Sequence, residues 1–580
     1  MEKCRIIGLA LVCLVLTMYH GALGLEIVGY QKISSTEGNF TGILDDGDAL
    51  GCRGIAYLGD LDGDGTGDIA VGAPNDDDGW TDKGAVWIMF LNPDGTVKSH
   101  QKISAIQGNF TGIIRAYSYF GNSVACLGDL DGDGVTDIAV GMVADPDGLH
   151  NAGAVWILFL NSDGTVKAHQ KINEIEGGFT GTLSDGDKFS YSLDCLGDLD
   201  VDGVTDIAVV APDDDDGGEN RGAVWILFLN SDGTVKWQQK ISDTEGNFVG
   251  VLNNNDWFGL SVARLGDLDG DGVCDIAVGA HADDDGGISH GAVWILFLNA
   301  DGTVKTHQKI SDTQGNFTGD LDDYDFFGSS VVSLGDVDGD GVNDLAVGTD
   351  GDDDGGHNRG AVWIMFLNSD GTVKDHQKIS DTEGGFTGII DTDDKFGCAL
   401  ALVDDLDGNG TVDLIVGARG DDDGGYDRGA VWILFLKGTT VLDVAVGHIE
   451  DAMTRKAEAL ELIDEALASE QAARELLNDL RDSGDSNGLE PGDIVQASQK
   501  INSAMQHEVS SKKSLHRSIS QLEVSLAILN GQGHGNGQPN KNDEDYADEL
   551  INVDVNADTV IDFEDFYMLS QHWLESYGTK

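Results

Sequence analysis

The sequence predicts an all-β fold, a propeller of six four-stranded blades, on the evidence of two observations. First, the sixteen-residue phrase LGDLDGDGVCDIAVGA, at Leu265–Ala280, recurs six times with little change. The first aspartates of successive copies are 69 residues apart, so the chain is a tandem array of one supersecondary unit. Second, apolar runs and turn residues around the copies predict four antiparallel strands per repeat, which is the content of one propeller blade.

The repeat that begins at Ser261 shows these strands in order. SVARLGDL is strand-like, and after the acidic turn DIAVGA is a short apolar strand. The glycine-rich loop HADDDGGISH precedes a third, continuous apolar strand, GAVWILFLN. The turn at Ala300–Gly302 leads to TVKTHQKI, which alternates like a half-exposed outer strand. Radial packing of such sheets leaves few exposed edges, which favours a propeller.

One tryptophan per repeat stands at the same register of the third strand. An aromatic residue repeated in this way is typical of the core between blades rather than of a ligand platform. We therefore expect these residues to pack blade against blade. They are Trp87, Trp156, Trp225, Trp294, Trp363 and Trp432.

The two ends of the array predict how the ring closes. The first recognisable segment, Tyr30–Ile33, corresponds to the fourth strand of a repeat. The sixth repeat lacks that strand, because Lys437–Thr440 replaces the expected turn and outer strand. We expect the N-terminal strand to complete the last blade and close a propeller over residues 25–440.

The recurring loop has the donors of a calcium site. Positions 1, 3, 5 and 9 supply side-chain oxygens, position 7 supplies a backbone carbonyl, and the glycine at position 6 permits a sharp turn. One isolated DGDG could be a mere polar turn, but six copies in register favour Ca²⁺. An apolar run follows position 9, so the loop leads into a strand rather than the exit helix of an EF-hand. The predicted ligands, repeat by repeat, are Asp60, Asp62, Asp64, Thr66 and Asp68; Asp129, Asp131, Asp133, Val135 and Asp137; Asp198, Asp200, Asp202, Val204 and Asp206; Asp267, Asp269, Asp271, Val273 and Asp275; Asp336, Asp338, Asp340, Val342 and Asp344; and Asp405, Asp407, Asn409, Thr411 and Asp413.

The complete unit resembles an FG-GAP repeat. Phe-Gly pairs such as Phe258-Gly259 precede the first strand, the metal loop follows it, and Gly72-Ala73-Pro74 follows the second strand of the first repeat. FG-GAP repeats build the N-terminal propeller of integrin α subunits, which has seven blades where this array predicts six. Val201 replaces a loop glycine and Asn409 replaces a carboxylate, which weakens the expected third and sixth calcium sites.

The resemblance implies a cell-adhesion module with its protein ligand on the face opposite the metal loops. Strand order places the loops between second and third strands on that face, and these loops carry aspartate runs such as Asp283–Asp285. The runs could bind extra cations, or they could be solvated turns that keep the protein soluble. Arg419-Gly420-Asp421 spells the tripeptide that integrins recognise in their ligands, and we interpret it as coincidence because it lies in register with the other acidic loops.

Composition narrows the class of partner and the compartment. With a net charge of -69 over 580 residues, nucleic acid and anionic membranes are excluded as expected partners, because both require a positive surface. Residues 1–24 have basic residues, an apolar run and a small-residue cleavage site, so we predict a signal peptide and a secreted or extracellular protein. No later apolar run is long enough to span a membrane. The remaining cysteines, scattered over the repeats, are interpreted as small apolar residues rather than a disulfide framework. They are Cys52, Cys126, Cys195, Cys274 and Cys398.

The last part of the chain predicts a different architecture. Apolar residues at helical spacing, interrupted at Asp482–Pro491, predict an α-helical hairpin over residues 446–530. Residues 531–545 are rich in glycine and asparagine and are expected to be a flexible linker. Residues 546–580 resemble half of a dockerin, an EF-hand-like calcium module, which implies a possible cohesin-like partner. Its predicted ligands are Asp554, Asn556, Asp558, Val560, Asp562 and Asp565.

The sequence predicts that the protein functions as a calcium-binding interaction or assembly module rather than as an enzyme. It has no HExxH or GxSxG motif, and the recurring residues are those that the repeat itself requires. The alternative is a glycan-processing hydrolase or lyase with a site at the propeller axis. A constellation that breaks the six-fold pattern would support it, and the irregular inserts, such as Arg115–Tyr119 and Tyr324, are slight. A lectin-like binder of glycans fits the sequence as well as a protein binder does.

Overall fold

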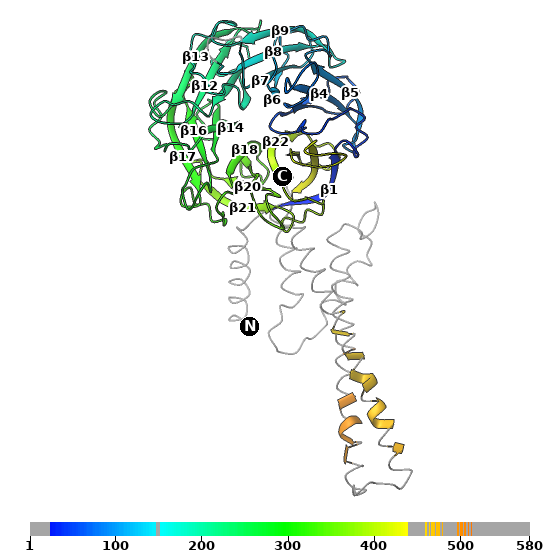
Figure 1. Cartoon of the computed structure of the whole chain (residues 1–580). Helices are drawn as coiled ribbons and strands as arrows, with labels where there is room; N and C mark the ends of the chain where they lie inside the picture. Colours follow the sequence, from blue (N-terminus) through cyan, green and yellow to red (C-terminus); the bar gives the residue numbers. More distant parts are fainter. Residues whose placement is uncertain are drawn as a thin grey trace, which may run out of the picture. The chain divides into compact units, whose positions relative to one another are not determined.

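The computed structural model describes residues 24–146, residues 151–438 and scattered helical residues between 457 and 512. The chain consists of two compact units. The first comprises Ala22–Gly438, and the second comprises Met1–Gly21 together with Thr439–Lys580. Described residues of the first unit form six four-stranded sheets around a common axis (Figure 1). This architecture confirms the predicted six-bladed propeller.

The first five blades each use four strands that are consecutive in sequence and pair antiparallel with their neighbours. Their strands are β2 (Ile55–Gly59), β3 (Asp68–Ala73), β4 (Ala85–Leu91) and β5 (Val97–Ser104); β6 (Phe120–Gly128), β7 (Asp137–Met142), β8 (Ala154–Leu160) and β9 (Val166–Ile172); β10 (Leu193–Gly197), β11 (Asp206–Ala211), β12 (Ala223–Leu229) and β13 (Val235–Ser242); β14 (Phe258–Gly266), β15 (Asp275–Ala280), β16 (Ala292–Leu298) and β17 (Val304–Ser311); β18 (Phe327–Gly335), β19 (Asp344–Thr349), β20 (Ala361–Leu367) and β21 (Val373–Ile379).

The sixth blade joins the two ends of the propeller. It combines β22 (Phe396–Val403), β23 (Asp413–Ala418) and β24 (Ala430–Gly438) with the N-terminal β1 (Leu25–Ile33). β1 runs antiparallel to β24, with Tyr30 opposite Leu434 and Ile33 opposite Val431. Figure 1 shows β1, in dark blue, beside the yellow strands that end the array. The predicted closure by the N-terminal strand is therefore confirmed.

The hydrophobic core lies between consecutive blades. The second and third strands of each blade are buried almost throughout, since a sheet packed on both faces needs apolar residues on both. Trp156 of the second blade packs with Ile88 and Phe90 of the first. Its indole also meets the Phe110 ring edge to face, at 5.1 Å between centroids. The tryptophans thus have the packing role predicted for them.

The first strand of each blade lies innermost. β2, β6, β10, β14, β18 and β22 together line an axial channel of about 420 Å³. The loop between the first and second strands opens at one end of this axis, and the loop between the second and third strands opens at the other. The metal loops and the acidic loops consequently lie on opposite faces of the propeller.

Several predicted segments lie outside the described residues. These are the signal peptide except Gly24, the linker, the dockerin-like module and most of the predicted helical hairpin. The described residues between 457 and 512 are helical, and an ion pair joins Lys512 with Asp464. None of the helices in the described part of the chain is long and apolar enough to cross a membrane.

Candidate metal loops and the opposite face

Each candidate metal loop is anchored by a buried aspartate at position 9. In the first blade this residue is Asp68, which opens β3 and is fully buried. Its carboxylate accepts hydrogen bonds from the backbone N–H groups of Leu61 and Leu91, both at 3.0 Å. The equivalent aspartates, from Asp137 to Asp413, accept the same two bonds at 2.9–3.1 Å. The carboxylate therefore ties the loop to the second and third strands of its own blade.

The aspartate at position 1 holds the turn closed. Asp60 accepts hydrogen bonds from the N–H groups of Asp64 at 2.9 Å and Gly65 at 2.8 Å. Gly65 has a φ of 94°, a left-handed conformation that glycine adopts without strain. Carboxylate oxygens of Asp60, Asp62 and Asp68 lie within 4.8 Å of one another. Four further loops bring three carboxylates together in the same way, in the groups Asp129, Asp131 and Asp137; Asp198, Asp200 and Asp206; Asp267, Asp269 and Asp271; and Asp336, Asp338 and Asp344.

These clusters fit a hard divalent cation. All side-chain donors are carboxylate oxygens, the ligand type that Ca²⁺ prefers. Burial raises the pKa of Asp68 to about 6, although its two backbone N–H donors favour the charged form. A bound cation would offset this burial, because it stabilises the ionised carboxylates. The predicted ligands at positions 1, 3 and 9 of the first, second, third and fifth loops, and at positions 1, 3 and 5 of the fourth, are therefore close enough together for one ion to contact them.

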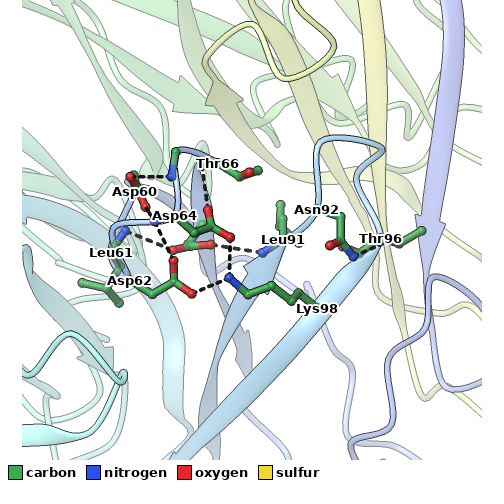
Figure 2. A network of polar contacts seen from close by, with 11 residues as sticks. Asp60, Leu61, Asp62, Asp64, Thr66, Leu91, Asn92, Thr96 and Lys98 are labelled. Atoms are coloured by element: carbon green, nitrogen blue, oxygen red, sulfur yellow. Dashed lines mark hydrogen bonds and ion pairs between the residues drawn. The ribbon is translucent and has the colours of Figure 1, made fainter.

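In five of the six blades, a lysine of the outer strand contacts the metal loop of the same blade. This contact was not predicted from the sequence. Lys98 of β5 reaches the outer oxygens of Asp62, at 2.5 Å, and of Asp64 (Figure 2). Its ammonium holds the pKa of Asp64 below the ordinary value. The fixed spacing of this lysine from each loop was a signal available in the sequence. The equivalent lysines are Lys167, Lys236, Lys305 and Lys374.

The sixth loop differs because its outer strand is β1. Its lysine position is taken by Val28, which is exposed, and position 5 of the loop is Asn409. The Asn409 side chain donates to Leu436 O at 2.9 Å and accepts from Thr411 N at 2.9 Å. Where the lysine is missing, one carboxylate is also missing, so the sixth loop has the same net charge as the other five.

The third loop keeps its shape despite Val201. This residue occupies a position that is glycine in the other loops and has a φ of 61°. Asp198 still accepts from Asp202 N and Gly203 N, each at 2.8 Å. A β-branched residue with positive φ is a steric outlier, so Val201 strains the turn without opening it. The predicted ligands of the C-terminal module, from Asp554 to Asp565, lie outside the described residues.

On the opposite face, buried lysines neutralise the acidic loops. Lys102 of β5 contacts Asp76 at 2.5 Å and Asp78 at 3.0 Å, and its ammonium lies 5.1 Å from the centroid of the Trp87 ring. Burial alone would lower the pKa of Lys102, but the two carboxylates raise it above the ordinary value. The same arrangement recurs at Lys32, Lys240, Lys309 and Lys378.

These contacts revise both interpretations of the aspartate runs. The first and third aspartates of a run, such as Asp76 and Asp78, share one buried lysine, so an internal cation already offsets part of their charge. The tripeptide at Arg419–Asp421 is also engaged internally. Asp421 contacts Lys32 at 2.5 Å, and Arg419 contacts Asp350 at 3.1 Å. The structure thus agrees with the interpretation of the tripeptide as coincidence.

Comparison with known families identifies the repeat unit. The FG-GAP repeat model matches residues 56–89, 120–158, 327–365 and 396–434. These stretches run from the first to the third strand of the first, second, fifth and sixth blades. Each contains one candidate metal loop.

Curated relatives include three integrin α subunits. Integrin alpha-2 of Mus musculus is 34% identical over 183 residues, which are 30% of this chain and 14% of the relative. Integrin alpha-PS2 of Drosophila melanogaster is 33% identical over 231 residues, 39% of this chain and 15% of the relative. Integrin alpha-5 of Xenopus laevis is 38% identical over 170 residues, 29% of this chain and 15% of the relative. The chain therefore spans only about a seventh of the length of these relatives.

Proposed function

Since the chain is an FG-GAP repeat β-propeller related to the integrin α subunits, we propose that it is a secreted, calcium-binding interaction module. Ca²⁺ in each loop stabilises its blade, and the face opposite the loops binds an extracellular protein or glycan. The dockerin-like segment at residues 546–580 is a second calcium module, which would attach the protein to a cohesin-like partner.

The observation that carries the calcium proposal is the convergence of carboxylates in the loops. Asp60, Asp62 and Asp68 have oxygens within 4.8 Å of one another, and a buried aspartate fixes each loop to its blade. Lys98 contacts only positions 3 and 5 of its loop, so it balances part of the negative charge. A divalent ion among the remaining oxygens would offset most of the remaining negative charge. Calcium binding would consequently stabilise the joint between the first and second strands.

The relatives support an adhesion or assembly role. They are integrin α subunits, but the chain matches only 14–15% of their length, so partner binding is inferred for the propeller alone. Loops on a rigid scaffold are the usual place for recognition, and the loops between second and third strands all lie on the same face of the propeller. We assign the docking of the partner to that surface.

The contacts of the acidic loops favour the binder over the glycan-processing enzyme. Glycoside hydrolysis uses a pair of carboxyl groups, one as acid and one as base or nucleophile. In five blades the described pairs on the opposite face, such as Asp214 and Asp216, are bridged by a lysine, here Lys240 at 2.7 and 2.6 Å. The Lys240 ammonium occupies the space between the two carboxyl groups, where a scissile bond would have to lie. It keeps the pKa of Asp216 below the ordinary value, whereas burial raises the pKa of Asp214.

The proposed function can be tested by capture of partners from the surroundings of the native protein. The immobilised full chain is incubated in calcium and, separately, in excess chelator with magnesium, and the retained protein and glycan are identified. The proposal expects a specific partner that is retained only in calcium. A partner retained equally in chelator would contradict the role of calcium, and turnover of a glycan library by the same preparation would support the enzyme instead.

A further inference from the structure

One position of the repeat breaks the six-fold pattern. It follows the second strand directly, recurs every 69 residues and lies at the end of the blade opposite the metal loop. The first three repeats place only apolar residues there, whereas the last three place His281, Asp350 and Arg419. A repeat does not require such residues, so their presence on one side of the ring needs another explanation. In chain order the six residues are Pro74, Val143, Pro212, His281, Asp350 and Arg419.

The three polar residues line one cavity of about 250 Å³. Three more of its residues, Trp257, Phe326 and Lys395, come from the turns just before the first strands. These turn residues have φ between 55° and 60°, and the same left-handed conformation recurs at the equivalent position of every blade. The cavity is completed by Arg53 and Tyr191, and Arg53 also lines the axial channel. The pocket is therefore built from the variable positions of five blades.

Three polar groups in this pocket lack an internal partner. Trp257 Nε1, His281 Nδ1 and Arg419 Nε are buried and have no hydrogen-bond partner among the described residues. The His281 side chain is only 8% exposed, and burial lowers its pKa to about 3, so the imidazole is neutral. Leaving buried donors unpaired is costly, and native proteins rarely do so without a ligand or a functional reason. The Trp257 and Arg419 N–H groups of the pocket are therefore donors without an acceptor among the described residues.

The charge of the pocket is opposite to that of the whole protein. Arg53, Lys395 and Arg419 line it, against Asp350 as its one carboxylate, although the chain carries a net charge of -69. Asp350 is engaged by Arg419 at 3.1 Å. Arg53 lies 4.7 Å from the centroid of the Tyr191 ring and donates only a long bond, of 3.4 Å, to Ser329 O. The cationic side chains that line this partly open cavity therefore outnumber the anionic one.

We propose that this axial pocket binds one carboxylate side chain, aspartate or glutamate, of a partner protein. A carboxylate supplies several acceptor lone pairs to the unpaired donors, and its planar group matches the guanidinium of arginine. The cavity has room for about one side chain and one charge. The proposal deepens the proposed function and rests on it only in placing the partner on this face of the propeller.

An acidic sugar would supply the same charge, but the aromatic rings of the pocket favour a side chain. Sugar recognition would use a free aromatic face. Trp257 already stacks on His281, with centroids 5.0 Å apart and an interplanar angle of 14°. The Tyr191 ring is covered by Arg53 and, at 5.6 Å, by the Lys188 ammonium. The acidic loops around the axis would also repel a segment with many carboxylates, so we infer a single acidic residue in an otherwise neutral or basic segment.

The test uses small probes on the full chain. Binding of N-acetyl-glutamate N-methylamide is measured by NMR titration against its glutamine counterpart, which has the same shape without the charge. The proposal expects the glutamate probe to bind and the glutamine probe to bind at least about tenfold more weakly, the loss typical of a missing charged hydrogen bond. Equal binding of the two probes, or no binding of either, would overturn it. Preference for glucuronate over the glutamate probe would overturn the assignment to a protein side chain.

A charge-neutral variant locates the binding. The double substitution Asp350→Val/Arg419→Val removes the ion pair of the pocket and installs the residue that the second repeat carries at this position, Val143. Its matched control is Arg221→Val/Asp243→Val, which removes an ion pair of 2.7 Å on the same face but outside the cavity. The glutamate probe should lose about tenfold or more in affinity with the first variant and little with the control. Equal effects of the two would overturn the location.

The single substitution His281→Val provides a second test in case the double variant does not fold. It changes no charge and removes one unpaired buried group, and it should weaken the glutamate probe severalfold. Because the probes need neither calcium nor a natural partner, their result is independent of the capture experiment. A partner retained in calcium together with silent probes would refute the pocket alone, and bound probes without any captured partner would refute the proposed function alone.

Discussion

At the scale of single residues, the loops show where the chain tolerates strain. Val201 stands with φ of 61° where the other loops have glycine, and it is 85% exposed, so packing does not compensate for the strain. The loop survives because Asp198 and Asp206 keep all their bonds to the backbone. The sequence identified the substitution, but only the conformation shows that its cost lies in the backbone.

Val201→Gly should stabilise the protein. The left-handed conformation costs a β-branched residue about 1 kcal/mol or somewhat more, and glycine adopts it without this strain. The urea midpoint of unfolding should therefore rise. Gly270→Val is the matched control in the fourth loop. Gly270 has φ of 79° and no atom within 4 Å of an added Cβ, so this change tests backbone strain alone and should lower the midpoint. A midpoint unchanged in both variants would show that the left-handed conformation carries no cost here.

At the scale of the blade, two lysines of the outer strand differ in burial and in the loop that they contact. In the third blade Lys240 is 8% exposed and joins β13 to Asp214 and Asp216, in the loop between the second and third strands. Lys236, four residues earlier, is 34% exposed and contacts the metal loop. The strand pattern was predictable from the alternation of TVKxHQKI. Which lysine is buried was not, because that depends on the neighbouring loop and on the tryptophan beneath it.

Lys240→Met should destabilise the protein by about 3 kcal/mol or more, because it leaves two carboxylates without the cation that they were buried with. Lys236→Met should have a far smaller effect, since its pair is exposed to solvent and screened by salt. Both are measured as shifts of the urea midpoint in chelator, so that calcium does not contribute. Equal shifts for the two lysines would argue against the buried bridge as a structural element.

At the scale of the whole molecule, the same pKa shift recurs in several blades, so its contributions to stability add up. One buried aspartate precedes the first strand in five of the blades, and burial raises the pKa of each to about 7 from 3.8. The folded state therefore binds more protons than the unfolded state between about pH 4 and pH 7. The contribution of these groups to stability is full below pH 4 and is lost as the pH rises through 7. They are Asp48, Asp187, Asp256, Asp325 and Asp394.

The melting temperature in chelator should accordingly be higher at pH 5.5 than at pH 8.5. The second blade has Ser118 at this position, so a neutral residue is compatible with the fold. Asp187→Asn combined with Asp256→Asn should reduce the difference between the two pH values, whereas Glu245→Gln, at an exposed position, should not. The account of these buried carboxyls fails if the melting temperature rises with pH instead.

The ring and its closure were predictable because both follow from a fixed period. Six copies 69 residues apart and a missing last strand leave little choice of architecture. The axial pocket escaped prediction for the opposite reason, since His281, Asp350 and Arg419 lie far apart in sequence and each replaces only the last residue of the motif that ends at Pro74 in the first repeat. Aligning the repeats and reading down one column would have revealed them. Their convergence with Arg53 and Trp257 required the closed ring.

The central claim, that the loops of the propeller bind calcium and stabilise their blades, is tested most directly by calorimetric titration of the full chain with Ca²⁺ after chelation. The six propeller loops and the C-terminal module predict about seven ions per chain, with a melting temperature that rises as the ions bind. Absence of calcium binding, together with identical melting curves in calcium and in chelator, would contradict it.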